Sequence, residues 1–189
     1  MRPSRCTCLV LLVFALAFMA APATATTLIR QGVKQLAREN AVVLTARVVD
    51  LYTHWNEDHS FIVTDVTLRP SQVYKGAQSS RDVRITLLGG TIGDITTLVI
   101  GGPELVPGSE YLFFLNDEEL PGGRVHTTVR DLVQGVFQIE RTKGRALARS
   151  LAIGHPLLAD ADGRTEPAGG VNGLDLEALE AEVRASITE

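Results

Sequence analysis

Hydrophobic and polar residues alternate in several short stretches between residues 42 and 139, and glycine or proline separates these stretches. Apolar residues at every second position lie on one face of an extended strand, so the alternation predicts half-buried strands. The clearest sets are Val42, Leu44, Ala46 and Val48; Ile62, Thr64, Val66 and Leu68; and Val83, Ile85 and Leu87. The stretch Tyr111 to Leu115 is apolar at every position, which predicts a strand covered on both faces.

The breaks between these strands contain residues that are typical of turns. Asn56-Glu57-Asp58 separates the first two strands and predicts a hairpin with a longer loop. Pro70 has no N–H group to donate to a ladder, so we expect it to end the second strand. Further strands are expected at Ile95 to Ile100, Val125 to Val129 and Val133 to Ile139, the last with Gly135 at a bulge or bend. Together the strands predict a mainly β fold, a small antiparallel barrel that is closed or nearly closed, with a β-sandwich as the alternative.

Two amphipathic helices are expected to flank this barrel. The first is expected from Thr27 to Glu39, where Gly32 weakens it by about 1 kcal/mol. The second is C-terminal, since apolar residues recur there at helical spacing, at Leu176, Leu179, Val183 and Ile187. Asp175 is the expected N-cap of this helix, and we expect the apolar stripe to pack on the barrel, with an unknown partner as the alternative.

The N-terminal residues have the pattern of a secretory signal peptide. Arg2 and Arg5 precede the uncharged apolar run Leu9 to Ala21, and Ala23-Thr24-Ala25 follows as a small-residue cleavage site. The expected organisation is a signal peptide at 1–25, a β-barrel domain with its first helix at 26–140, an irregular connection at 141–172 and a C-terminal helix at 173–189. Within the connection, Arg145 to Ala152 is expected to form one or two helical turns. The expected location is the periplasm or the medium, with the membrane met only through the transient signal peptide.

Removal of the signal peptide changes the composition in two ways. Cys6 and Cys8 are the only cysteines, so the mature chain has none, which excludes thiol catalysis, disulfides and cysteine-ligated zinc. The loss of two arginines leaves 16 basic and 22 acidic residues, a net charge of −6. An acidic chain without a basic stripe is not expected to bind nucleic acid.

The densest cluster of polar side chains is the sequence His54-Trp55-Asn56-Glu57-Asp58-His59. Two imidazoles and two carboxylates within six residues could ligate a divalent metal, but the spacing matches no standard zinc motif. A solvated hairpin loop is the other interpretation. Trp55 is either an exposed aromatic residue for recognition or a cap over the barrel.

The second candidate surface is Gly89-Gly90-Thr91-Ile92-Gly93-Asp94, which looks like a phosphate-binding loop but lacks its Lys-Ser/Thr pair. A strand connection is the better interpretation. No Gly-x-Ser-x-Gly motif is present and His126 is isolated, so no catalytic site, metal or cofactor is expected. The candidate binding residues on the loops are therefore His54, Trp55, Asp58, His59, Thr91 and Asp94.

Three sequences carry a resemblance to a known group: Val73-Tyr74-Lys75-Gly76, Gly108 to Leu115, and Gln134-Gly135-Val136-Phe137. Their order resembles a group of bacterial exported proteins of unknown function, whose domain is similar to the OB-like barrel of netrin-like modules and tissue inhibitors of metalloproteinases. The resemblance covers Thr27 to Ile139 and implies the fold. Those inhibitors chelate the protease zinc through an N-terminal cysteine, which the mature chain lacks.

The residues and the resemblance together predict an exported, non-catalytic binding module whose partner is an unknown protein. The loops from Tyr52 to Ser60 and from Gly89 to Asp94 are the expected contact surfaces, since OB-type barrels bind through one sheet face and its adjoining loops. One alternative is an inhibitor or chaperone of a secreted metalloprotease, which would make a secreted protease the partner. The other is a metal-binding protein or hydrolase that uses the loop from His54 to His59.

Overall fold

The computed structural model describes residues 28–76, 81–130, 132–142, 144–152, 158–159 and 173–188. The predicted signal peptide and the loop expected at 160–172 lie outside these residues. Within the described part, no helix is both long and apolar enough to cross a membrane.

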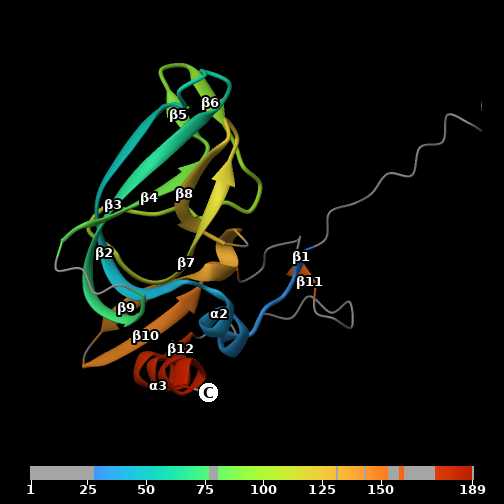
Figure 1. Ribbon diagram of the computed structural model, residues 1–189. Coiled ribbons are helices and arrows are strands. Elements are labelled where there is room, and N and C mark those ends of the chain that lie inside the picture. Colours follow the sequence, from blue (N-terminus) through green and yellow to red (C-terminus); the bar gives the residue numbers. More distant parts are fainter. Residues whose placement is uncertain are drawn as a thin grey trace, which may run out of the picture.

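The protein is mainly β, and its largest sheet curls into a half-barrel (Figure 1). The antiparallel strands follow the order β12-β10-β9-β7-β2-β3-β4, and β8 pairs with the far half of β7. Their bounds are β2 Val42–Trp55, β3 Ile62–Lys75, β4 Val83–Leu88, β7 Glu110–Leu120, β8 Arg124–Val129, β9 Val136–Thr142, β10 Arg145–Ser150 and β12 Leu174–Asp175. β8 lies beside β4, but no backbone ladder joins the two among the described strands. The predicted β fold is confirmed, and the barrel stops short of closure.

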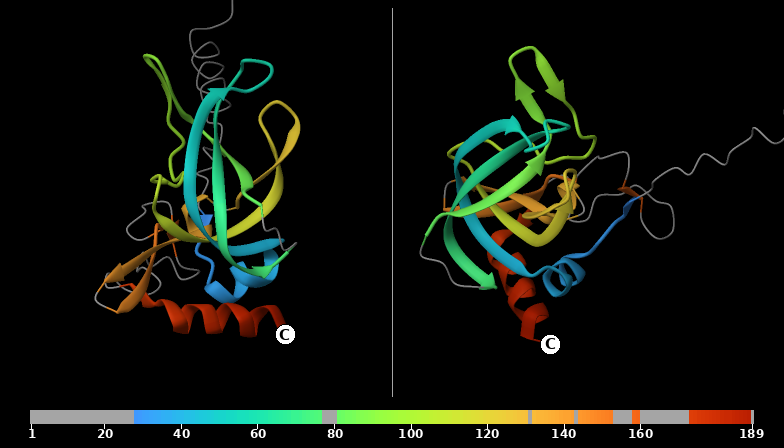
Figure 2. Two further views of the ribbon diagram at one scale, coloured as in Figure 1. Left: turned by 90° about the vertical axis from the view of Figure 1, so that its left-hand side faces the viewer. Right: turned by 45° about the horizontal axis from the view of Figure 1, so that its top comes forward.

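The remaining elements are short. β5 Gly90–Ile92 and β6 Ile95–Thr97 form a separate hairpin, and β1 Leu28–Ile29 pairs in parallel with β11 Leu158–Ala159. The 3-10 helix η1 Leu132–Gly135 precedes β9, and the α-helices are α2 Val33–Glu39 and α3 Leu176–Thr188. Both α-helices lie at the end of the half-barrel opposite to the hairpin tips (Figure 2).

Two hydrophobic cores lie on opposite faces of the sheet. One fills the curl of the half-barrel and includes Leu44, Val66, Ile85 and Phe113. The other lies between the sheet and the two helices; it includes Val43, Leu112, Phe114, Leu36 and Leu179. Tyr111 to Leu115 are all buried, which confirms the prediction of a strand covered on both faces.

The C-terminal helix packs as its apolar stripe predicts. Leu176, Leu179 and Val183 are buried against the second core. The Asp175 carboxylate accepts hydrogen bonds from the backbone N–H groups of Glu177 at 3.1 Å and Ala178 at 3.2 Å, so it caps the helix as expected. The stripe is therefore an internal contact of the protein.

The Lys75-Gly76 sequence has a structural role in this fold. The Lys75 ammonium donates to the backbone carbonyls of Ala37 at 3.0 Å and Arg38 at 2.7 Å, at the C-terminus of α2. A cation is favourable there because the last carbonyls of a helix carry partial negative charge. Gly76 has φ +93°, and a Cβ atom would lie 2.9 Å from Val42, so the turn requires glycine.

Four predicted boundaries were wrong. The strand expected at Ile95 to Ile100 ends at Thr97. β3 continues through Pro70 to Lys75, because the β2–β3 register shifts beside Pro70 and β4 pairs only with residues 63–68 of β3. Pro70 therefore lies at a bulge with a free edge, where no N–H donor is required. The first helix begins only after Gly32. The segment Val133 to Gly135 is a 3-10 turn, and the last predicted strand begins at Val136.

The helical turns expected at Arg145 to Ala152 are also wrong. Residues Arg145–Ser150 form β10, which pairs with β9 on one side and with β12 on the other. The apolar residues Ala146 to Ala148 lie between Arg145 and Arg149, and pairing with an existing sheet edge decides the conformation over the local helical preference.

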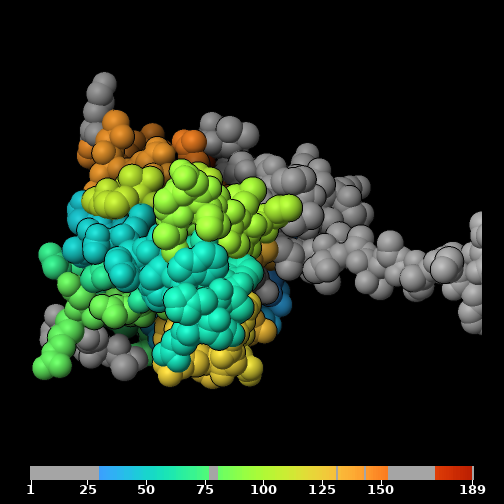
Figure 3. Space-filling view, turned by 90° about the horizontal axis from the view of Figure 1, so that it is seen from above, coloured from blue at the N-terminus to red at the C-terminus, as the bar shows by residue number. Residues whose placement is uncertain are grey.

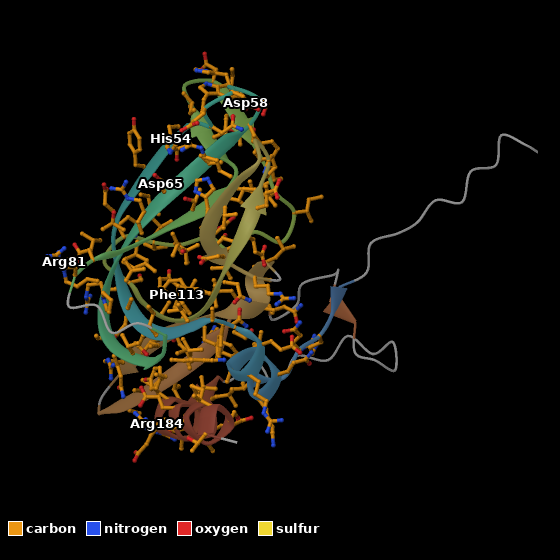
Figure 4. All side chains as sticks on the ribbon, viewed as in Figure 1. His54, Asp58, Asp65, Arg81, Phe113 and Arg184 are labelled. Atoms are coloured by element: carbon orange, nitrogen blue, oxygen red, sulfur yellow. The ribbon has the colours of Figure 1, made fainter. Side chains whose placement is uncertain are left out.

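Tyr74 links the sheet to the C-terminal helix. Its hydroxyl lies 3.2 Å from the Thr45 hydroxyl, and the Arg184 guanidinium lies 5.3 Å from the centre of its ring. Arg184 projects from α3 towards the sheet (Figure 4). Burial raises the pKa of Tyr74 to about 12, because desolvation penalises the phenolate.

This pKa predicts how stability falls at alkaline pH. An unfolded tyrosine ionises near pH 10, so the unfolded state releases its proton before the folded state does. The contribution of Tyr74 is therefore complete below about pH 10 and is lost as the pH rises to about 12. We expect the free energy of unfolding, measured by urea denaturation, to fall more steeply over this range in the wild type than in Tyr74→Phe. Tyr52→Phe, at an exposed tyrosine, is the control; parallel curves for wild type and Tyr74→Phe would contradict the prediction.

Candidate functional site

Three hairpin tips gather at the end of the half-barrel that the helices leave uncovered. Seen from above, the β2–β3 tip lies between the β5–β6 hairpin and the β7–β8 hairpin (Figure 3). Neighbouring residues of a strand point to opposite faces, so Thr53 and Thr64 line one hollow whereas His54 and Asp65 line another. The end of the sheet thus carries two hollows, one on each face.

The hollow on the His54 side, here called the His54 pocket, has a volume of about 510 Å³. That volume is within the range of small-molecule sites. It lies between the β2–β3 hairpin, β4 and the β7–β8 hairpin. Its polar lining consists of His54, Asn56, Glu57, Asp58, Asp65, Arg84, Thr86, Arg124 and His126.

A chain of side-chain hydrogen bonds crosses the pocket from β3 to β8. Asp65 and Thr86 lie directly opposite in the β3–β4 ladder, and the Thr86 hydroxyl donates to the Asp65 carboxylate at 2.8 Å. The hydroxyl has one proton, so at 3.2 Å from His126 Nδ1 its oxygen is the acceptor and Nδ1–H is the donor. Nδ1 therefore carries the proton of neutral His126, and Nε2 keeps a lone pair that has no partner among the described residues.

His54 lies at the other side of Asp65 (Figure 4). Its Nδ1 lies 2.7 Å from the Trp55 carbonyl oxygen, and its Nε2 lies 3.4 Å from the Asp65 carboxylate. Each ring nitrogen of His54 therefore faces an acceptor oxygen. Tyr52 stacks on the ring, with the two centroids 5.3 Å apart. The Asp65 carboxylate is thus held between a hydroxyl donor and an imidazole.

The turn of the β2–β3 hairpin is held by its own polar side chains. The Asn56 side-chain oxygen accepts from the Phe61 N–H at 2.9 Å, and the Asn56 amide donates to the Pro121 carbonyl at 3.2 Å, which ties this tip to the β7–β8 tip. Asp58 accepts from the hydroxyl and the N–H of Ser60 at 2.6 and 3.0 Å, and these bonds lower the pKa of Asp58. His59 has φ +58°, a left-handed conformation, and is exposed.

The two arginines of the pocket differ in their surroundings. Arg124 forms an ion pair with Glu57 at 2.6 Å. Arg84 projects from β4, two residues before Thr86 and on the same face of the strand. Within the described ranges, Arg84 has neither an ion pair nor a hydrogen bond through its side chain. It is therefore an arginine at a pocket wall whose charge no described side chain neutralises.

The sequence prediction located part of this site. His54 and Asp58 line the pocket, and half-buried Trp55 contributes its backbone carbonyl. His59 does not line it, and Thr91 belongs to the β5–β6 hairpin on the other face, where its hydroxyl lies 2.9 Å from that of Thr96. Asp94 lies in the turn of that hairpin and lines neither hollow.

Sequence reasoning missed Asp65, Arg84, Thr86 and His126, which lie on strands rather than in loops. The only sequence signal for these residues was the alternation of polar and apolar positions in two strands. Asp65 and Thr86 occupy polar positions next to buried apolar residues. Among the residues that the structure describes, no three His, Cys, Asp or Glu side chains converge in a way that could hold a metal ion. The geometry thus gives the metal-binding alternative at His54 to His59 no support.

The hollow on the other face, here called the hairpin groove, lies between the β5–β6 hairpin with the segment 98–105 and the sheet. Its volume is about 810 Å³, and its lining includes nine aliphatic residues, among them Leu51, Leu87, Val99 and Leu105, together with five threonines and four glycines. At its rim, Leu98 is 79% exposed and Ile100 is 67% exposed. These two side chains add exposed apolar surface to the rim of the groove.

No protein-family model matches the chain, and no curated protein matches it either.

The hydrogen-bond chain predicts the tautomer of His126. At a pH where the ring is neutral, we expect the proton on Nδ1, whereas free imidazole side chains favour Nε2. Thr86→Val removes the acceptor for Nδ1–H and should shift the ring towards the Nε2–H form. Long-range ¹H–¹⁵N spectra of the imidazole nitrogens distinguish the two tautomers.

The matched control is Thr128→Val, which replaces another buried threonine, on β8 itself, and should leave the His126 tautomer unchanged. An Nε2–H tautomer in the wild-type protein, or the same tautomer in wild type and Thr86→Val, would show that Thr86 does not orient the ring.

Proposed function

We propose that the protein is an exported, non-catalytic binding module that recognises a partner protein through the hairpin groove. The observation that carries this proposal is the exposure of Leu98 and Ile100, at 79% and 67%, beside an aliphatic groove. Exposed apolar patches on folded proteins mark contact surfaces, because their burial in a complex removes apolar area from water.

The arrangement of the two ends supports the same surface. The helices cover the sheet at one end, where their apolar faces are buried in the second core. The hairpin end has no such cover in the described part of the chain (Figure 2). The strand order, with β8 returning beside β4, is consistent with the predicted OB-like barrel, a fold that binds through one sheet face and its adjoining loops.

The other parts of the proposal come from the sequence. The N-terminal pattern of Arg2, Arg5 and the apolar run supports export to the periplasm or the medium. The acidic mature chain supports a protein partner over nucleic acid. The described polar cluster supports a non-catalytic role, since Thr86 donates its hydroxyl proton to Asp65 and so is not a nucleophile activated by His126.

The test is capture of exported proteins by the purified full chain, quantified by mass spectrometry. We expect a partner that the wild type binds and that Leu98→Ser/Ile100→Ser binds at least about tenfold more weakly, since two large apolar contacts are lost. Val125→Ser is the matched control, because Val125 is as exposed as Ile100, at 67%, but does not line the groove. Equal recovery of every captured protein with the double variant and the wild type would refute the groove as the contact surface.

A further inference from the structure

The geometry points to a second site, independent of the hairpin groove: we infer that the His54 pocket binds a small carboxylate that carries a hydroxyl or amide N–H beside the carboxylate. Arg84 would be the charge partner of the carboxylate, and His126 Nε2 would accept the hydrogen bond from the adjacent donor.

The pocket lining carries three carboxylates and two guanidiniums, and one of these guanidiniums is available to an anionic ligand. Each of its three carboxylates already has partners: Glu57 pairs with Arg124, Asp58 is bonded by Ser60, and Asp65 is held by Thr86 and His54. The guanidinium of Arg84 also lines the pocket, and it has no ion-pair or hydrogen-bond partner among the described residues. A guanidinium presents parallel N–H donors that match the two oxygens of a carboxylate.

His126 restricts the ligand further. Its Nδ1–H is committed to Thr86, so the neutral ring offers only an acceptor at Nε2. A bare carboxylate has no proton to donate to that lone pair. A hydroxyl or N–H on the neighbouring carbon supplies one, as in a 2-hydroxy acid or in the C-terminal residue of a peptide.

The spacing of the two residues suits a ligand of this size. Arg84 and Thr86 lie two residues apart on one face of β4, which separates their Cα atoms by about 7 Å. Thr86 fixes the His126 ring at 3.2 Å, so the guanidinium and the imidazole approach one pocket from neighbouring positions. Val63, which is 5% exposed, and Leu120, which is 8% exposed, supply an apolar wall to the same pocket.

The experiment is calorimetric titration of the full chain with five probes: glycolate, N-acetylglycine, acetate, glycolamide and inorganic phosphate. We expect glycolate or N-acetylglycine to bind about fivefold more tightly than acetate, which lacks the donor. Glycolamide, which lacks the charge, should not bind. Whichever of the first two probes binds more tightly identifies the source as a hydroxy acid or a peptide C-terminus.

Variants assign the binding to the two residues. Arg84→Gln should weaken binding about tenfold, and Arg84→Lys, which keeps the charge but not the paired donors, should be intermediate. Arg145→Gln is the matched control, since Arg145 is exposed, lacks a described ion pair and lies outside the pocket. His126→Gln should remove the preference for glycolate or N-acetylglycine over acetate, and the ring ¹⁵N signals of wild-type His126 should move on binding.

Four results would overturn the inference. They are no binding by glycolate or N-acetylglycine, equal affinity for acetate, tighter binding of phosphate than of either carboxylate, and equal losses in Arg84→Gln and Arg145→Gln. Thermal unfolding of each variant shows whether the fold is retained. We expect the Arg84 variants to fold, because the Arg84 side chain is exposed. These outcomes leave the hairpin groove untouched, because Leu98→Ser/Ile100→Ser changes no residue of the His54 pocket.

Discussion

The burial of one strand on both faces is the constraint on which the rest of this structure depends. Tyr111 to Leu115 of β7 alternate between the core inside the curl and the core beneath the helices, and the backbone of this segment pairs with β2 on one edge and β9 on the other. The next residues, Asn116 to Glu119, are polar and leave both cores. β7 is therefore anchored at one end only, and its far half pairs with β8 alone.

This division of β7 explains why the candidate sites share one end of the protein. The anchored half carries the sheet face on which both α2 and α3 pack, so the apolar surface at that end is covered. The free half of β7 forms the β7–β8 hairpin, which lies beside β4 and the β2–β3 tip. The His54 pocket lies between this hairpin, β4 and the β2–β3 tip. The hairpin groove forms on the opposite face of the same strands, since neighbouring residues point to opposite sides.

The sequence predicted features that depend on local pattern and missed features that depend on distant pairing. Strand alternation, the two-sided Tyr111 to Leu115 strand and the Asp175 cap are local and were predicted correctly. Pro70 was misjudged because its tolerance depends on where β4 stops pairing, and Arg145–Ser150 because an existing sheet edge recruits it. The pocket was half found for the same reason: His54 and Asp58 belong to one polar stretch of the sequence, whereas Asp65, Thr86 and His126 meet only after three strands assemble.

The hydrogen bonds between Asp65, Thr86 and His126 distinguish the His54 pocket from the hydrophobic cores. Thr86 is only 4% exposed, and a valine would fill the same space. A valine would leave the Asp65 carboxylate and the His126 Nδ1–H group without this partner, so the hydroxyl has a stabilising role. The hydroxyl adds direction, because it accepts from His126 Nδ1 while it donates to Asp65. This chain of groups fixes an imidazole lone pair at a pocket wall, which is the feature that the inferred carboxylate site uses, whereas the hydrophobic cores hold the strands together.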